Sequence, residues 1–437
     1  MIRVLSAKKM QSVAYVSRQK ICDRLLSTAA DRPTVFERAW MGFKHLIGKI
    51  PPTKRERVEL QELRLALLSI HSRRYEEDNP NQSHENKLSK LWKENERLKN
   101  VGLRYEIQVE LVPELLELFE TYHLVDKQLE SSPKQIDMLL FQDYEETCRA
   151  QHHSSSNNDY FLSTKRGALE ILLRDFGRSD SIPPKALPWE SSSSGGKHWY
   201  DQLDEFGYNG KNAKLDVYKA IRYHQAYNMA RSFLIKQHLG YSVLALKSNL
   251  AQAGRGMFLD GTAPSGAILA FFPGQVWPRE YLISPTHEVI EYLSWKNNPN
   301  FQLHFRGDDY CFDCRASPYT VLKESNPWAI AHIANHAPWC QANSRSIGIN
   351  FFEKMRLNSS LRKYIPNEYA KPPTLMGGSI LDRDAIEMHS FCLINRRREI
   401  SYEEILFDYN LSFLPEEMPE WYLQAGYKSN GMHEVYS

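Results

Sequence analysis

The sequence Glu404-Ile405-Leu406-Phe407-Asp408-Tyr409 lies close to the C-terminal end of a chain of 437 residues. Its alternation predicts a β-strand that carries Phe407 and Tyr409 on one face and Asp408 on the other. By itself such a segment is interpreted as a strand of the hydrophobic core. It gains meaning from three shorter features that precede it in the chain.

The first of these features is Ala253-Gly254-Arg255-Gly256-Met257-Phe258. A Gly-x-Gly pair ahead of a strand lets backbone N–H groups approach an anionic ligand closely, because no Cβ atom intervenes. A plain turn or bulge explains the same pair, and the third glycine of a dinucleotide-binding motif is absent. The second feature, Phe272-Pro273-Gly274-Gln275-Val276, follows the apolar run 267–271 and predicts a hairpin turn.

The third feature is Ala334-Asn335-His336, which is followed by Cys340 and Asn343. A buried Asn-His pair can hold a ligand through its amide and ring nitrogen atoms, or it can fix the conformation of a loop. Residue types alone leave both interpretations open.

Taken together and in this order, the features resemble the motifs of the SET domain, the fold of a family of protein-lysine methyltransferases. Gly254 and Gly256 match the Gly-x-Gly motif, residues 335–343 the Asn-His motif, and residues 404–409 the final motif, with isoleucine in place of leucine at 405. The resemblance covers about residues 242–410. Within it, residues 337–339 lengthen the Asn-His loop, and residues 354–384 are expected to form a loop insertion. The cysteine cluster that follows this domain in many histone methyltransferases is missing.

The resemblance implies an α+β fold, in which a SET domain of small curved β-sheets follows an α-helical N-terminal region. A C-terminal strand threaded beneath a loop would form a pseudoknot. The implied cofactor is S-adenosyl-L-methionine, and the methyl acceptor is a lysine side chain of a protein substrate. The residues implied to bind the cofactor are Gly254, Arg255 and Gly256 at its methionine portion, and Asn335 and His336 at its adenosyl end.

Two aromatic residues are implied to act on the substrate. Tyr409 would be the catalytic residue, whose hydroxyl orients the amine and polarises the methyl group. Phe407 would line the substrate channel, where the family has either tyrosine or phenylalanine. A tyrosine there holds a water molecule and limits the product to monomethyl-lysine, so Phe407 implies di- or trimethylation. No metal ion is implied at this site.

The first third of the chain predicts α-helices, because apolar residues recur at helical spacing over residues 54–78, 85–129 and 133–149. Pro113 is expected to break the second pattern into two helices. Another helix, over residues 216–238, is expected to end at Gly240. The predicted organisation is a basic segment 1–30, a helical region 31–150, a flexible linker with a short helix 151–200, the SET domain with its leading helix 201–412, and a tail 413–437.

Composition and charge limit the possible partners. The chain is 42% hydrophobic and carries a net charge of +2, which argues against a protein that coats nucleic acid. From this charge we expect no nucleic acid as partner. The chain has no run of 18 apolar residues that would predict a membrane-spanning helix, so we expect no membrane as partner either. The expected location is intracellular, in the nucleus or cytoplasm. The acid-free, basic segment 1–22 is also typical of a mitochondrial presequence, and a frayed basic terminus is the alternative.

Two further hypotheses remain open at this level. The pair Cys311-Phe312-Asp313-Cys314 supplies two thiols, whereas a structural zinc ion needs four ligands, so ordinary reduced cysteines are predicted and zinc is the alternative. For the whole chain, the alternative to a methyltransferase is a SET fold kept as a non-catalytic binding or scaffold protein. The presence of all the motif residues favours catalysis, since a scaffold needs none of their chemistry.

Overall fold

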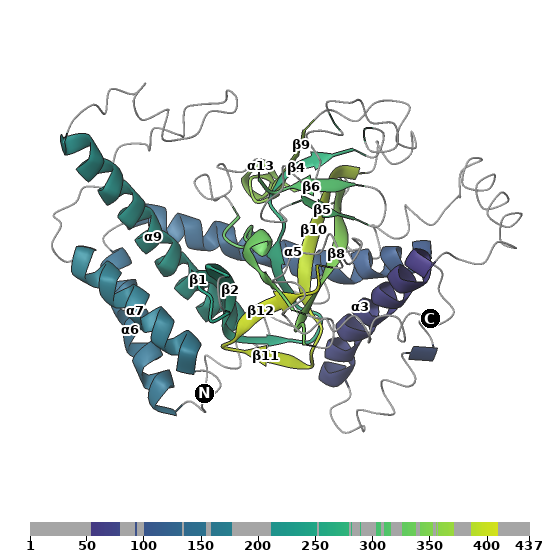
Figure 1. Ribbon diagram of the computed structural model, residues 1–437, viewed down its shortest axis with the longest axis horizontal. Helices are drawn as coiled ribbons and strands as arrows, with labels where there is room; N and C mark the ends of the chain where they lie inside the picture. The colour runs from purple at the N-terminus through teal and green to yellow at the C-terminus, as the bar shows by residue number, and fades with distance from the viewer. Residues whose placement is uncertain are drawn as a thin grey trace, which may run out of the picture.

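A computed structural model describes residues 54–78, 92–93, 100–132, 135–153, 159–176, 211–250, 253–278, 281, 289, 303–306, 310–315, 326–337, 341–352, 355, 357–370 and 386–409. The predicted segment 1–30, residues 177–200 of the predicted linker and the tail 413–437 lie outside these residues. In the described part of the chain, helices surround three small open β-sheets (Figure 1), which confirms the predicted α+β class.

The long helices of the described chain are α3 (Lys54–Asp78), α5 (Asn100–Ser131), α6 (Gln135–His153), α7 (Asp159–Phe176) and α9 (Lys211–Leu239). In Figure 1, α5 runs behind the strands, with α3 toward one of its ends and α6, α7 and α9 gathered toward the other. Gly240 ends α9 as predicted. It has a φ of 86°, and its N–H donates to the Lys236 carbonyl at 2.8 Å.

Helix α5 corrects the prediction of a break at Pro113, because the helix continues through this residue. A proline inside a helix removes one backbone hydrogen bond and costs about 3 kcal/mol. On both sides of it, however, the helix buries its apolar face completely, and each fully buried leucine or phenylalanine contributes about 1.5–3 kcal/mol. Burial against the sheets therefore outweighs the local cost. The fully buried residues on this face include Leu111, Leu115 and Phe119.

The strands form three sheets. The first contains β1 (Tyr241–Lys247), β2 (Arg255–Pro264), β12 (Glu404–Phe407) and β7 (Asn335–His336) in this order, and β11 (Glu399–Ser401) also pairs with β2. The second has the order β3 (Ile268–Phe271), β10 (Ile386–Asn395), β8 (Ser344–Phe352). The third has the order β5 (Leu303–Phe305), β6 (Cys311–Asp313), β4 (Gly274–Trp277), β9 (Asn367–Tyr369).

The predicted hairpin at residues 272–276 is wrong. Strand β3 pairs with β10, whereas β4 pairs with β6 and β9, so the chain passes from the second sheet to the third at Gly274. Gly274 has a φ of 105°, and a Cβ atom there would collide with the Asp313 carbonyl oxygen. The Pro-Gly sequence at 273–274 accounts for the change of direction, but the strands that pair with β3 and β4 lie far from them in the sequence.

The predicted loop insertion 354–384 is also wrong where the structure describes it. Residues 357–370 contain a short helix, α13 (Ser359–Arg362), and strand β9. The Asn358 side chain caps α13 by accepting a hydrogen bond from Leu361 N at 3.0 Å, and Tyr364 is completely buried. Elements this short have no periodicity that a sequence pattern can detect. Packing against α5 and pairing with β4 hold them in place.

One hydrophobic core joins the helices to the sheets. Phe119 of α5 stacks on Phe351 of β8 with ring centroids 5.6 Å apart. Gln108 of α5 completes the hydrogen bonding of β8, because its amide donates to Asn350 O at 3.0 Å and accepts from Asn350 N at 2.7 Å. The helices are therefore part of the structure that supports the strands.

A buried charge network joins α6, α7, α9 and β2. Lys165 Nζ lies 2.5 Å from both Asp143 Oδ1 and Asp260 Oδ2, and Lys236 Nζ lies 3.0 Å from Asp260 Oδ1. Burial raises the pKa of Asp143 to about 6. Burial also acts on Asp260, but the charges of the two lysines outweigh it and lower the pKa of this carboxyl. A cavity of about 210 Å³ adjoins the network and is lined in part by Lys236, Asp260 and Tyr402.

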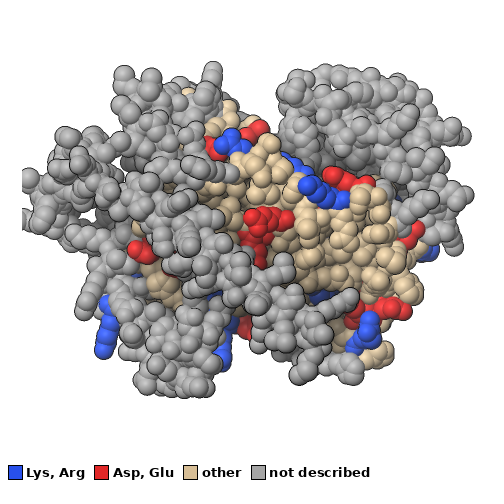
Figure 2. Space-filling model, turned by 180° about the vertical axis from the view of Figure 1, so that it is seen from behind, with Lys and Arg blue, Asp and Glu red and all other residues tan. Residues whose placement is uncertain are grey.

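The surface of the described chain gives two further observations. On the face shown in Figure 2, positive and negative side chains are interspersed among neutral ones. Among the residues that the structure describes, no helix is both long enough and apolar enough to span a membrane.

Candidate active site

The C-terminal strand β12 lies between β2 and β7 and brings the sequence motifs together. It pairs antiparallel with β2 and parallel with β7, where Leu406 and Phe407 lie opposite residues 335–336. The glycine motif at the start of β2 and the Asn-His motif of β7 therefore flank one strand. Segments separated by roughly 70 residues or more in the sequence become neighbours.

Asn343 fastens the Asn-His loop to β12. Its Oδ1 accepts from Leu406 N and its Nδ2 donates to Glu404 O, both at 2.8 Å. Its backbone N–H also donates to Leu406 O at 3.1 Å. Asn343 is almost completely buried, so one side chain joins the segment just before β8 to the backbone of β12.

Gly256, Asn335 and Glu404 meet at the start of β12. Asn335 Nδ2 donates to Glu404 Oε1 at 2.8 Å and to Arg255 O at 3.2 Å, and Ser248 Oγ donates to the Glu404 carboxylate at 2.8 Å. A Cβ atom on Gly256 would overlap this carboxylate and would lie 3.0 Å from Asn335 Nδ2. Glycine is required here because the carboxylate occupies the space of a side chain.

Tyr409 adjoins the same motifs. Its hydroxyl donates to Ala334 O at 2.8 Å, and its backbone N–H donates to His336 Nδ1 at 3.3 Å. The rings of Tyr409 and His336 pack edge to face with centroids 5.2 Å apart. The Asn-His motif thus fixes both the main chain and the phenol of Tyr409.

Phe407 lies on the same side as Tyr409, as the alternation predicts, with ring centroids 4.8 Å apart. Phe272 packs against Phe407 edge to face at 5.6 Å, and His304 lies 6.0 Å from it. Phe407 is 3% exposed. An aromatic wall made of Phe272, His304 and Phe407 therefore ends at Tyr409.

Burial sets the protonation states of this region. It raises the pKa of the Tyr409 hydroxyl well above its usual range, and the negative charge of Glu404 adds to the effect. It lowers the pKa of His336 to about 4, although a hydrogen bond with the Phe407 backbone opposes this. At neutral pH the phenol therefore keeps its proton, which it donates to Ala334 O, and the imidazole is uncharged, so the Tyr409 oxygen can accept a hydrogen bond.

The other predicted site residues lie around this centre. Gly254 is exposed, has a φ of 71° and has open space on its side-chain face, and the Arg255 side chain is exposed beside it. Asn335 is half-buried, whereas His336 is 7% exposed. Cys340, which follows the Asn-His pair in the sequence motif, lies outside the described residues. The structure thus brings Gly256, Asn335, His336 and Tyr409 together and leaves Gly254 and Arg255 at the surface.

Sequence reasoning did not assign roles to Glu404, Asn343 or Ser248. Glu404 and Asn343 belong to the quoted motifs, and this is the signal that points to them. Ser248 belongs to no motif, and only its two contacts with the Glu404 carboxylate identify it.

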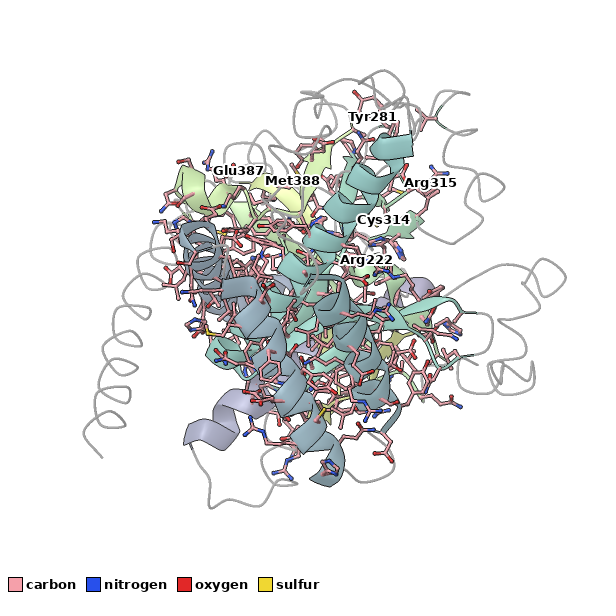
Figure 3. All side chains as sticks on the ribbon, turned by 90° about the vertical axis from the view of Figure 1, so that its left-hand side faces the viewer. Arg222, Tyr281, Cys314, Arg315, Glu387 and Met388 are labelled. Atoms are coloured by element: carbon pink, nitrogen blue, oxygen red, sulfur yellow. The ribbon has the colours of Figure 1, made fainter. Side chains whose placement is uncertain are left out.

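The cysteine pair lies at β6. Cys311 and Cys314 are free and buried, and burial raises the pKa of both thiols well above their usual range, which leaves them protonated. Figure 3 shows Cys314 next to Arg315 at the end of β6, away from Glu387 and Met388. Within the described residues, no three His, Cys, Asp or Glu side chains form a group that could hold a metal ion.

Comparison with known proteins adds no family assignment, because neither a scan of family models nor a search of curated proteins finds a match to this chain.

Proposed function

We propose that this chain transfers a methyl group from S-adenosyl-L-methionine to a lysine side chain of a protein, as its resemblance to SET-domain methyltransferases implies. The observation that carries the proposal is the position of β12. This strand connects the glycine motif, the Asn-His motif and Tyr409 within one hydrogen-bonded group. A scaffold role requires no such convergence of motifs that lie far apart in the sequence.

The fold part of the proposal is a SET domain. The position of β12 between β2 and β7, together with the hydrogen bonds of Asn343 to its backbone, supports a threaded C-terminal strand. Within the family, we propose SET domain-containing protein 9 as the nearest likeness. This rests on the helix that leads into Gly240-Tyr-Ser-Val243, on the Pro273-Gly274 turn and on Asn326-Pro327.

The residues around Gly254 fit the methionine end of the cofactor. The positive φ of Gly254 and the open space beside it leave the backbone accessible, and the exposed Arg255 guanidinium offers a positive charge to a carboxylate. The half-buried Asn335 would contact the adenosyl end, with His336 behind it. When bound, the cofactor supplies an electrophilic methyl group on a positively charged sulfur atom.

The reaction is an in-line displacement. The neutral lysine nitrogen forms a bond to the methyl carbon while the carbon–sulfur bond breaks, and the extra proton of the amine passes to water. Alignment and exclusion of water supply most of the rate enhancement. Tyr409 would orient the amine through its phenol oxygen, which can accept an N–H because the hydroxyl proton is donated to Ala334 O. The apolar wall containing Phe407 favours the uncharged amine.

Two experiments test the proposal: calorimetry with S-adenosyl-L-methionine, and a methyl-transfer assay on a degenerate peptide library with a central lysine. We expect the chain to bind S-adenosyl-L-methionine and to methylate the lysine library but not a matched library with a central arginine. Tyr409→Phe should lower the rate about 10²-fold or more while cofactor affinity changes little. Tyr144→Phe is the control, because that hydroxyl donates to Glu170 on the helix surface. If S-adenosyl-L-methionine does not bind, the methyltransferase hypothesis is wrong and the scaffold hypothesis remains.

A further inference from the structure

His304 is a half-buried histidine that no predicted motif includes. It lies on β5, opposite Phe312 of β6, and its ring centroid is 4.4 Å from that of Phe272 and 6.0 Å from that of Phe407. Because Phe407 contacts Tyr409, His304 belongs to the aromatic wall that ends at the candidate site. It is the polar member of that wall.

The Nε2 atom of His304 is buried and has no hydrogen-bond partner in the described structure. The large majority of buried side-chain polar atoms in proteins are hydrogen-bonded, and an exception indicates a missing ligand or water. Nothing in the packing of His304 against phenylalanine rings requires a polar atom. The unused nitrogen therefore points to a ligand that carries a hydrogen-bond donor.

The charge state of His304 fits such a ligand. Burial lowers its pKa to about 3, and the neighbouring His332 adds to the effect. Burial also lowers the pKa of His332 to about 4, with a further contribution from the charge of Arg255. Both rings are neutral at pH 7. With its proton on Nδ1, His304 presents an Nε2 lone pair that accepts an N–H group and does not repel an amine.

We propose that His304 Nε2 accepts an N–H of the substrate lysine amine and thereby stops methylation at the dimethyl state. This inference rests on the proposed function. A neutral lysine amine has two N–H groups and a monomethyl-lysine amine has one, so either can bond to His304 while its lone pair faces the methyl donor. A neutral dimethyl-lysine amine has none, and it leaves Nε2 without a partner. Phe407 alone implies room for trimethylation, and His304 removes that last step.

The first test uses wild-type protein with ¹³C-labelled histidine side chains and two small amines as lysine mimics. We expect n-butylamine to shift the His304 ring signal. N,N,N-trimethylbutylammonium, which lacks an N–H, should leave it unchanged. The exposed His152 serves as the internal control. This readout needs no cofactor and no turnover. If neither amine moves the His304 signal, or if both move it equally, the inference is wrong even when S-adenosyl-L-methionine binds.

The second test measures product states by mass spectrometry on the lysine-centred library. Wild type should give mono- and dimethyl-lysine, His304→Phe should add trimethyl-lysine, and His304→Gln, which keeps an acceptor, should behave like wild type. If the wild-type protein forms trimethyl-lysine at early times, the inference about His304 is wrong, but the proposed methyltransferase function still holds. Absence of all methylation together with an n-butylamine shift would instead overturn the proposed function and keep the amine contact at His304.

Discussion

At the level of single residues, Glu404 organises the candidate site. Its carboxylate accepts hydrogen bonds from Ser248 and Asn335 and occupies the space above Gly256. It also helps to keep the Tyr409 hydroxyl protonated. A buried carboxylate with several donors is held in one orientation. The first residue of the C-terminal motif thus fixes the two motifs that precede it.

Gly256→Ala tests this arrangement. The added methyl group overlaps the Glu404 carboxylate, which cannot move without breaking the bonds to Ser248 and Asn335. We expect the free energy of unfolding to fall by about 2–3 kcal/mol, as for other overpacked sites. Urea denaturation followed by tryptophan fluorescence measures it.

Gly167→Ala is the matched control. This glycine lies inside α7, and no atom other than those of its chain neighbours and the nearby helix backbone lies within 4 Å of the place that an alanine Cβ would take. Alanine should therefore raise stability by about 0.5–1 kcal/mol. Equal effects of the two substitutions would show that the Glu404 carboxylate is free to move.

At the level of elements, α7 is joined to β2 by a single buried lysine. Lys165 is the shared partner of Asp143 and Asp260, and all three side chains are at most 2% exposed. Lys165→Met keeps the length of the side chain but removes the positive charge that lies between the two buried carboxylates. The expected loss in unfolding free energy is about 3–5 kcal/mol.

The control for this prediction lies one residue away. Arg166 pairs with Glu170 at 3.5 Å, and both side chains are more than 40% exposed. Arg166→Met should therefore cost less than about 1 kcal/mol. Adding Asp143→Asn to Lys165→Met should recover part of the loss, and no recovery would show that the carboxylates are not the cause.

At the level of the whole molecule, buried histidines make stability depend on pH. Burial lowers the pKa values of His304, His332 and His336 to about 3, 4 and 4, below the usual value near 6.5. Between pH 6.5 and 4 the unfolded chain therefore binds more protons than the native state, so the free energy of unfolding decreases as the pH is lowered. Asp143, with its pKa raised to about 6, acts in the opposite direction over the same range.

The three histidines outweigh the one carboxyl. Each contributes at most about 2 kcal/mol between pH 7 and pH 5, so the protein should lose a few kcal/mol over that interval. Urea denaturation at pH 7, 6 and 5 measures the loss, and His304→Phe should reduce its slope by about a third. Stability that is constant or increases toward pH 5 would contradict this prediction.

The amino-acid sequence alone determined the helical periods of α3, α6 and α9, the C-cap at Gly240 and the alternation of Phe407, Asp408 and Tyr409, because these depend on spacing within a few residues. Tertiary structure alone decided that α5 continues through Pro113, that β3 and β4 belong to different sheets, and that residues 357–370 form α13 and β9. It also decided that Ser248 reaches Glu404 and that His304 adjoins Phe407. Each of these depends on packing between segments distant in the chain, and the free energy of that packing exceeds local preferences.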